Sequence, residues 1–228
     1  MKREILGVKI DDLNMEEALG MVEGWLGKSE KHYIVTPNPE MLVEAQKNPE
    51  FKEILNKADL AIPDGAGLKL AGINNRVAGV DFMEQLVNLA AEKDWTVGFL
   101  GGQEGVAELA VSKLKQASPS LKVSFITHDT NYIIPATDIL LVALGHVKQE
   151  KWIAENLPQI PVKVAMGVGG SFDYISGKVP RAPKWLRSIG LEWLFRLIIQ
   201  PWRIKRQIAL IRYLWLTLTS FPRRRESN

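Results

Sequence analysis

Short apolar runs alternate with longer amphipathic stretches along most of this chain. The apolar runs have the length of strands, and they are Ile5–Ile10, Tyr33–Thr36, Leu60–Ile62, Thr96–Leu100, Val123–Ile126, Ile139–Leu144 and Val162–Met166. A run such as Ile139–Leu144 is apolar at every position, which is typical of a strand buried on both faces of a sheet. Strands that alternate with helices in this way predict an α/β fold, with a Rossmann-like, mainly parallel sheet and helices on both faces.

The amphipathic stretches carry helix start signals. Two capping boxes are predicted, at Asn14 with Glu17 and at Asp81 with Glu84. Helices are therefore expected over residues 14–26 and 81–93, and the pattern adds further helices at 65–72, 103–117 and 148–157.

Glycine and polar residues gather where the predicted strands end. These clusters are Thr36-Pro37-Asn38-Pro39, Pro63-Asp64-Gly65-Ala66-Gly67, Gly101-Gly102, Gly145 and Gly167-Val168-Gly169-Gly170. Ligands of open parallel sheets bind at the carboxyl ends of the strands, near a switch in strand order. Five such clusters together favour a nucleotide-type ligand.

The character of the chain changes at Pro180. Helices are expected over Trp185–Gln200 and Arg203–Thr219, separated by Pro201. In the second helix one face is apolar, because its large residues recur at steps of four and three: Ile204, Ile208, Ile211, Trp215 and Leu218. The sequence thus predicts an α/β body at residues 1–179, a helical appendage at 180–221 and an unstructured tail at 222–228.

Composition supports a globular protein but hides an asymmetry of charge. With 46% hydrophobic residues, 24% charged residues and no Cys, the chain is neither disordered nor stapled by disulfides. The net charge of +3 divides into −7 for residues 1–177 (17 Lys/Arg, 24 Asp/Glu) and +10 for residues 178–228 (12 Lys/Arg, 2 Asp/Glu).

Basic residues beside an apolar, aromatic stripe are typical of a helix that lies on an anionic membrane surface. Two alternatives stay open: the stripe packs on its own body, or it is buried in a homo-oligomer. No signal peptide or spanning segment is recognised, so we expect a cytoplasmic protein, peripheral on the inner face of the cell membrane, with no nucleic-acid partner.

Several catalytic classes are disfavoured by missing motifs. The chain has no Walker loop and no nucleophile elbow, and Phe172 interrupts the dinucleotide fingerprint that would begin at Gly167. Its three His are far apart and no Asp-x-Asp pair occurs, so no metal or other cofactor is expected. Acid–base chemistry at the strand ends remains, and Asp64 is its best candidate. The alternative is that Asp64 only caps the helix at 65–72.

Thr36, Asn38 and the Lys148-Gln149-Glu150 segment have two interpretations as well. Thr36 and Asn38 are either turn residues or hydrogen-bond donors to a ligand. Lys148-Gln149-Glu150 equally suits the solvated first turn of a helix.

Seven motifs in order resemble the WecG/TagA/CpsF family of glycosyltransferases. They lie between about Ile5 and Tyr213, at Thr36–Met41, Pro63–Gly65, Arg76–Asp81, Gly98–Gly102, Lys148–Glu150, Gly167–Asp173 and Gly190–Leu197. The sequence departs from the family pattern at His146-Val147, where a Gly-x-Pro normally precedes Lys148. From Phe221 to Asn228 it matches nothing in the pattern.

The resemblance implies transfer of a sugar from a UDP-sugar to a polyprenyl-pyrophosphate-linked acceptor at the membrane, with inversion and without a metal. In members that act in wall teichoic acid synthesis, the donor is UDP-N-acetylmannosamine, and its sugar is joined by a β-1,4 linkage to undecaprenyl-pyrophosphate-N-acetylglucosamine. Other members use UDP-N-acetylmannosaminuronic acid as the donor. A non-catalytic nucleotide-sugar or membrane-binding scaffold is the alternative from another class.

The resemblance also implies roles for individual residues. Asp64 matches the position of the proposed general base in the family, and Thr36 matches the position of the residue beside that base in the active site. The remaining candidates are expected around the substrate: Asn38, Arg76, Gln149, Asp173, Gly101 and Gly102.

Overall fold

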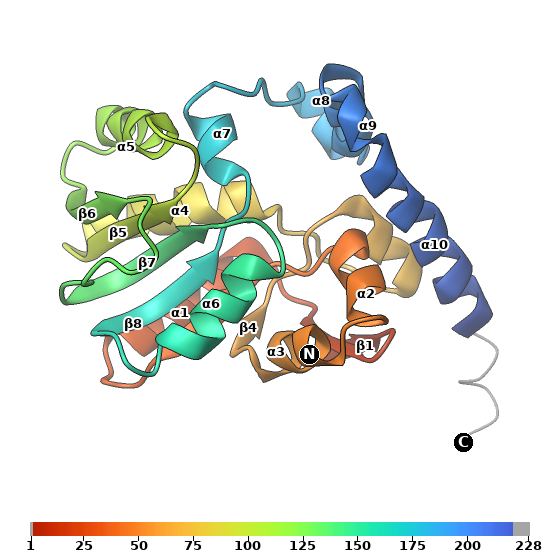
Figure 1. Ribbon diagram of the computed structural model, residues 1–228, viewed down its shortest axis with the longest axis horizontal. Coiled ribbons are helices and arrows are strands. Elements are labelled where there is room, and N and C mark those ends of the chain that lie inside the picture. Colours follow the sequence, from red (N-terminus) through yellow and green to blue (C-terminus); the bar gives the residue numbers. More distant parts are fainter. Residues whose placement is uncertain (1, 221–228) are drawn as a thin grey trace.

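The computed structural model describes residues 2–220, with the exception of the side chains of Arg203, Lys205, Arg206, Gln207 and Ser220. Its centre is a sheet of six strands, all parallel, in the order β4-β3-β8-β7-β5-β6 (Figure 1). The strands are β3 (His32–Val35), β4 (Leu60–Ala61), β5 (Thr96–Gly101), β6 (Lys122–Thr127), β7 (Thr137–Ala143) and β8 (Val162–Gly167). The prediction of a parallel α/β sheet is confirmed.

Helices cover both faces of this sheet. One face packs against α1 (Met15–Leu26), α4 (Gly79–Glu92) and α5 (Val106–Ala117), which share the largest buried core with the strands. The other face packs against α6 (Lys148–Asn156), whose Ile153 is fully buried beside β7 and β8. Strands enclosed on both faces explain why the central runs are apolar throughout.

At the N-terminus the prediction of one strand over Ile5–Ile10 is wrong. The segment belongs to an antiparallel hairpin, β1 (Lys2–Ile5) and β2 (Val8–Asp11), which forms a sheet of its own. Leu6 and Gly7 both have positive φ, at 51° and 75°, as a tight two-residue hairpin turn requires. The apolar run is continuous in sequence, so only the backbone reversal reveals the two strands.

Two short helices follow β3 that the hydrophobic pattern did not predict: α2 (Pro39–Ala45) and α3 (Pro49–Lys57). Each begins with an Asn cap followed by Pro, at Asn38 and Asn48, whose side chains accept from the backbone of Met41 and Phe51. The Asn-Pro signal could have located them, because Pro favours the first helical position.

Of the two predicted capping boxes, one forms. Asn14 and Glu17 exchange side-chain and backbone hydrogen bonds of 3.0 and 2.8 Å at the start of α1. The box at Asp81 and Glu84 is wrong, because α4 begins two residues earlier, at Gly79, and its cap Ala78 has no side-chain acceptor. Asp81 and Glu84 instead pair with arginines of the C-terminal region.

The C-terminal region contains α8 (Lys184–Ser188), α9 (Glu192–Ile199), the 3₁₀ turn η2 (Pro201–Arg203) and α10 (Ile204–Ser220). The single helix expected over Trp185–Gln200 is in fact two helices, because Gly190 has φ +80° and interrupts it. We call residues 180–220 the appendage. A short helix, α7 (Ser171–Ile175), precedes it. None of the helices in the described part of the chain is both long and apolar enough to cross a bilayer.

One face of α10 packs on the body and another faces outward. Tyr213 is fully buried beside α2, and its hydroxyl donates to the Gly67 carbonyl at 3.1 Å. The predicted apolar stripe lies on the outward face and is 56–72% exposed: Ile204, Ile208, Ile211, Trp215 and Leu218. The contact with the body therefore uses a different face from the one that the sequence pattern marked.

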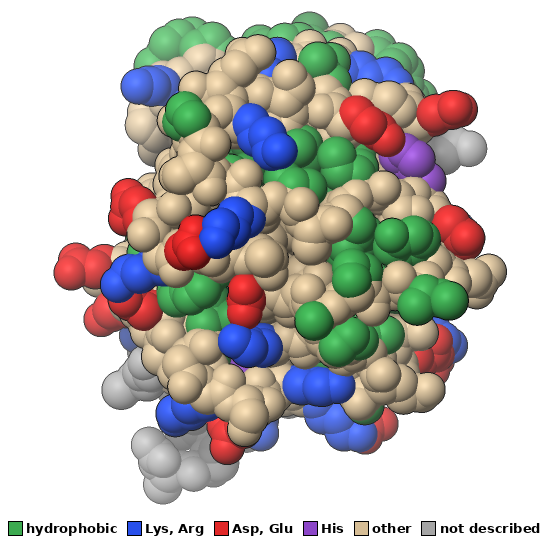
Figure 2. All heavy atoms as spheres, turned by 90° about the vertical axis from the view of Figure 1, so that its left-hand side faces the viewer, with side chains coloured by type: hydrophobic (Ala, Val, Ile, Leu, Met, Phe, Trp, Pro, Cys, Tyr) green, Lys and Arg blue, Asp and Glu red, His purple; other side chains and the backbone are tan. Residues whose placement is uncertain are grey.

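The surface of the body carries charged side chains of both signs. At the end that contains α5, β6 and β7, acidic and basic side chains are interspersed (Figure 2).

Asp12 ties the N-terminal hairpin to the loop that leads into Arg76. Its carboxylate accepts from the backbone N–H groups of Asn74 and Asn75, at 3.1 and 2.9 Å, and from Arg3 at 3.1 Å. Burial would raise the pKa of Asp12, but these donors and the charge of Arg3 outweigh it and hold the pKa below its ordinary value.

We expect Asp12→Ala to lower the free energy of unfolding by about 1–3 kcal/mol at pH 7, since it leaves two backbone donors without their charged acceptor. Because the pKa is lowered in the folded protein, this contribution is present above about pH 4 and is lost as the pH falls through the folded pKa. Urea denaturation at pH 7 and pH 3 measures both. Lys57→Ala, which breaks an exposed pair with Glu53, is the control and should change the free energy of unfolding much less than Asp12→Ala does, because the pair is solvent-screened.

Candidate active site

A cavity of about 870 Å³ lies between the carboxyl ends of the strands and the appendage. The body contributes the strand-end loops, and the appendage contributes side chains from α9 and α10, including Trp193, Arg196, Leu210 and Leu214. This volume suits a ligand the size of a nucleotide-sugar. The cavity contains all but one of the predicted site residues: Thr36, Asn38, Asp64, Arg76, Gly102, Gln149 and Asp173.

Asp64 lies at the tip of β4, where two strand ends meet. Its backbone N–H donates to the Pro37 carbonyl at 3.0 Å, which joins the loop after β4 to the loop after β3. The following residue, Gly65, has φ +96°, and a Cβ there would lie 3.2 Å from Pro39, so the turn requires glycine. Asp64 does not cap the next turn, η1 (Ala66–Ala71), which has no side-chain cap; that alternative is wrong.

The Asp64 carboxyl instead faces the N-terminus of α4. Burial is the largest influence on its pKa and raises it to about 6. The negative charge of Glu192 also raises this pKa. The charge of Arg76 and the backbone N–H groups of Gly79 and Gly65 lower it. A carboxyl with a pKa near 6 is ionised at neutral pH and still binds a proton well. These are the properties that a general base requires.

Thr36 and Asn38 lie beside Asp64 on the loop after β3. Asn38 caps α2, since its side-chain oxygen accepts from the Met41 N–H at 3.0 Å, so one of its two predicted roles is structural. Thr36 packs against the first turn of α4, where a Cβ on Gly79 would lie 3.2 Å from its methyl group. Glycine at position 79 therefore lets Thr36 and the N-terminus of α4 approach one another closely at the wall of the cavity.

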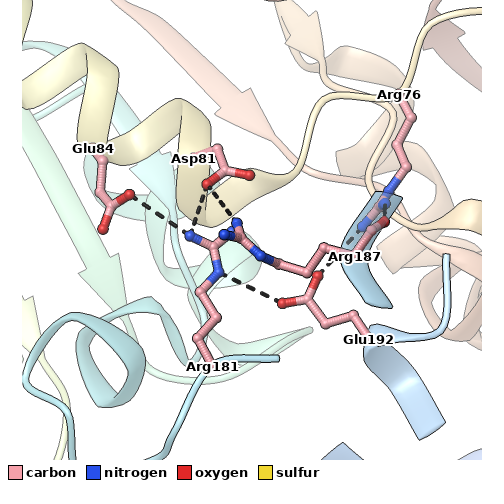
Figure 3. A network of polar contacts seen from close by, with 6 residues as sticks. All are labelled: Arg76, Asp81, Glu84, Arg181, Arg187 and Glu192. Atoms are coloured by element: carbon pink, nitrogen blue, oxygen red, sulfur yellow. Dashed lines mark hydrogen bonds and ion pairs between the residues drawn. The ribbon is translucent and has the colours of Figure 1, made fainter. Parts of the chain in front are cut away.

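Arg76 is held by the appendage. Its Nη1 donates to the Arg187 carbonyl at 2.9 Å, and its Nη2 pairs with Glu192 at 3.4 Å. Figure 3 shows this pair as part of a network in which arginines from two segments of the appendage reach Asp81 and Glu84 on α4. Arg76 is thus a point at which the body and the appendage join.

Gln149 and Glu150 are buried, at 3% and 0% exposure, so the interpretation of this segment as a solvated first turn is wrong for both. The Gln149 oxygen accepts from the Gly169 N–H at 2.9 Å, and its nitrogen donates to Glu150 at 2.7 Å. Burial raises the pKa of Glu150, while its hydrogen bond with Gln149 opposes the rise. These bonds fix the amide of Gln149 at the wall of the cavity.

The loop before Gln149, which departs from the family pattern, is strained. Val147 has φ +70°, a conformation that a β-branched residue rarely adopts. Strain of this kind persists where the surrounding structure imposes it, and functional sites are common places for it. His146 on the same loop lies 3.8 Å from Glu40 and also lines the cavity.

Of the two glycines, only Gly102 lines the cavity. Gly101 has φ +89°, and a Cβ there would lie 2.7 Å from the Ala143 carbonyl, so it serves the close approach of β5 to β7.

Asp173 lies in the first turn of α7 opposite Arg196, which stacks on Tyr174 at 4.7 Å from the ring centroid.

Sequence reasoning did not single out Arg181, Glu192 or Arg196 as cavity residues. All three belong to the appendage and line the cavity opposite Asp64. One feature of the sequence could have pointed to this part of the cavity: Glu192 is the only acidic residue between Lys178 and Ser220, in a segment that is otherwise basic. Among the residues that the structure describes, no three His, Asp or Glu side chains gather as a metal site would require.

Comparisons with known proteins place the chain in a family. A family model described as "Glycosyl transferase WecG/TagA/CpsF family" matches residues 3–227. The match continues past Phe221, so the expectation that the final residues lie outside the family pattern is wrong. Whether residues 222–228 are unstructured lies outside the described residues.

Among curated proteins, the chain is similar to enzymes named N-acetylglucosaminyldiphosphoundecaprenol N-acetyl-beta-D-mannosaminyltransferase. The Bacillus subtilis (strain 168) enzyme is 32% identical, with 81% of each chain covered. The Bacillus spizizenii enzyme is 33% identical over 85% of this chain and 81% of its own. The Staphylococcus aureus (strain MRSA252) enzyme is 29% identical over 90% and 87%.

Proposed function

Because the chain belongs to the WecG/TagA/CpsF family of glycosyltransferases, we propose that it transfers N-acetylmannosamine from UDP-N-acetylmannosamine to undecaprenyl-pyrophosphate-N-acetylglucosamine in a β-1,4 linkage. The names of its relatives support this sugar and this acceptor. The observation that carries the proposal is Asp64: a carboxyl with a pKa of about 6, beside a helix N-terminus, in a cavity of the right volume.

In the proposed reaction Asp64 is the general base. It takes the proton from the acceptor hydroxyl as that oxygen attacks the anomeric carbon of the donor. The bond between the anomeric carbon and the UDP oxygen breaks, and UDP departs with the electron pair. A single displacement of this kind inverts the anomeric centre. Thr36 lines the same cavity as Asp64, and we propose that its hydroxyl contacts the reacting sugars.

The departing UDP needs positive or dipolar groups around its pyrophosphate. Arg76, Arg181 and Arg196 line the cavity, and guanidinium groups match the geometry of phosphate oxygens. The loop that contains Gly169 and Gly170 lies at the same wall, and Gln149 and Asp173 flank it. We propose that these groups bind the donor without a metal ion, and that addition of EDTA leaves turnover unchanged.

The lipid acceptor requires contact with a membrane, and the appendage is suited to it. Besides the outward stripe on α10, the appendage exposes other large apolar side chains on α8, directly after α8, on α9 and on η2: Trp185, Ile189, Trp193, Ile198 and Trp202. Because the appendage also walls the cavity, a membrane-bound appendage would bring the lipid pyrophosphate to Asp64. We propose that the protein binds the inner face of the cell membrane in this way.

The proposed function is tested by measuring UDP release from UDP-N-acetylmannosamine with and without the lipid-pyrophosphate acceptor. We expect release that depends on the acceptor and a disaccharide product of inverted configuration. A parallel assay measures UDP release from UDP-N-acetylmannosaminuronic acid and compares it with release from UDP-N-acetylmannosamine. A scaffold without catalytic activity would release no UDP with either donor, and preference for the uronic acid would replace N-acetylmannosamine in the proposal.

A further inference from the structure

Glu192 is the exceptional charge of the appendage. It is the only acidic residue between Lys178 and Ser220, yet it lies at the first position of α9 and its side chain is 18% exposed. An acid that served only solubility would lie on the surface. Glu192 instead lines the cavity that contains Asp64.

Its carboxylate is shared between two arginines from different parts of the chain. One oxygen lies 3.4 Å from Arg76 Nη2 and the other lies 3.6 Å from Arg181 Nε (Figure 3). Arg181 in turn pairs with Asp81 at 2.7 Å, which fixes it to α4. Glu192 therefore bridges a guanidinium anchored to the body and one that lies beside the catalytic carboxyl.

The arginines of this network carry unsatisfied donors. Among the described residues, the buried guanidinium nitrogens without a hydrogen-bond partner are Arg76 Nε, Arg181 Nε, Arg181 Nη2 and Arg187 Nε. The Glu192 oxygen 3.6 Å from Arg181 Nε forms an ion pair that is longer than a hydrogen bond. Guanidinium groups with unsatisfied donors are costly to hold in place, and a carboxylate between them offsets their mutual repulsion. Without Glu192, Arg76 would keep its hydrogen bond to the Arg187 carbonyl and its electrostatic attraction to Asp64.

We propose that Glu192 is a positioning residue of the transferase site: with the appendage docked, its carboxylate holds Arg76 and Arg181 at the cavity beside Asp64. This inference rests on the proposed function and deepens it, because it gives the appendage a second task besides contact with the membrane. Docking of α9 would complete the arrangement of charges that the reaction uses.

The charge of Glu192 also acts on Asp64, whose pKa it raises while Arg76 lowers it. Replacing Glu192 with Gln should therefore lower the pH at which Asp64 ionises. The other charged or titratable groups that face this cavity come from α2, the loop after β7, α7 and the appendage, and they are Glu40, His146, Asp173, Tyr174, Arg181 and Arg196. None of them changes in this variant.

The test compares Glu192→Gln, Glu192→Asp and the control Glu84→Gln. Glu84 belongs to the same network, 3.7 Å from Arg181, but it is not among the groups that act on Asp64. Carboxyl NMR titration of full-length protein, with Asp64 assigned by Asp64→Asn, gives the ionisation midpoint, and kcat/KM is measured with the lipid acceptor. Thermal denaturation confirms that each variant is folded.

We expect Glu192→Gln to lower the Asp64 midpoint by at least about half a pH unit, because it removes a neighbouring negative charge. Glu192→Asp keeps the negative charge but loses the reach to Arg76, whose charge lowers the pKa of Asp64, so the midpoint of this variant should not fall below that of the wild type. Both variants should lose about tenfold in kcat/KM, since the arginines are misplaced. Glu84→Gln should change the midpoint by less than about 0.2.

The proposal is overturned if Glu192→Gln matches Glu84→Gln in both midpoint and kcat/KM. Failure of the proposed function gives a different result, namely no acceptor-dependent UDP release by the wild-type protein. In that case the NMR midpoint still decides whether Glu192 acts on Asp64. Should Glu192→Gln not fold, the kcat/KM of Glu192→Asp decides the positioning role.

Discussion

Replacing Asp64 with Asn is expected to reduce acceptor-dependent UDP release by at least about a thousandfold, because the variant cannot take the proton from the acceptor hydroxyl. In the wild-type protein, turnover should rise with pH through about 6, where the base ionises. The pH profile of kcat/KM and the residual rate of Asp64→Asn measure these effects. Asp94→Asn, at an exposed residue paired with Lys122, is the control and should retain full activity.

The same substitution should not weaken the fold. A carboxyl whose pKa rises from 3.8 to about 6 on folding binds its proton more tightly in the native state, so ionisation above pH 6 destabilises the protein by at most about 3 kcal/mol. Asn removes that cost. We expect Asp64→Asn to be at least as stable as the wild type at pH 8, with the gain lost below about pH 4, where both forms are neutral.

Urea denaturation at the two pH values checks this expectation. Near-normal turnover in a folded Asp64→Asn protein would exclude Asp64 as the base. A variant that loses both activity and stability at pH 8 would instead point to a structural role for the carboxylate at the end of β4.

The second large effect is expected on the outward face of α10. Replacing Ile208, Ile211 and Trp215 with Ser should reduce binding to anionic vesicles by about a hundredfold or more, because three exposed apolar side chains no longer enter the interface. Binding of the wild type should also weaken with salt, since the attraction of basic residues to the membrane is screened. Transfer to the lipid acceptor should fall with vesicle binding.

This variant is sharper than truncation after Val179, since truncation would also remove the wall of the cavity and the buried Tyr213. Vesicle flotation and thermal denaturation measure binding and folding, and Leu109→Ser on α5 is a matched control at an exposed apolar residue of the body. Unchanged flotation would contradict the membrane role. A change from oligomer to monomer in sedimentation, with flotation unchanged, would assign the face to a homo-oligomer.

Much of the fold is predictable from the sequence because its signals are local. Uniform apolar runs identify strands such as β7, and the Asn14–Glu17 box identifies α1. The hairpin at Ile5–Ile10 is missed because Leu6 interrupts no hydrophobic pattern while its backbone reverses. The false box at Asp81 fails for a related reason: the motif is present, but its carboxylate has stronger partners in Arg181 and Arg187.

The sequence by itself determined that this is a parallel α/β protein with polar strand-end loops, an acidic body and a basic appendage, and it singled out Asp64 as the candidate base. These features depend on residue type and spacing along the chain. Only the tertiary structure decided that the appendage walls the cavity, that α10 packs through Tyr213 and leaves its stripe outward, and that Glu192 reaches Arg76. Such contacts join residues more than a hundred positions apart, and they arise from packing that no local pattern encodes.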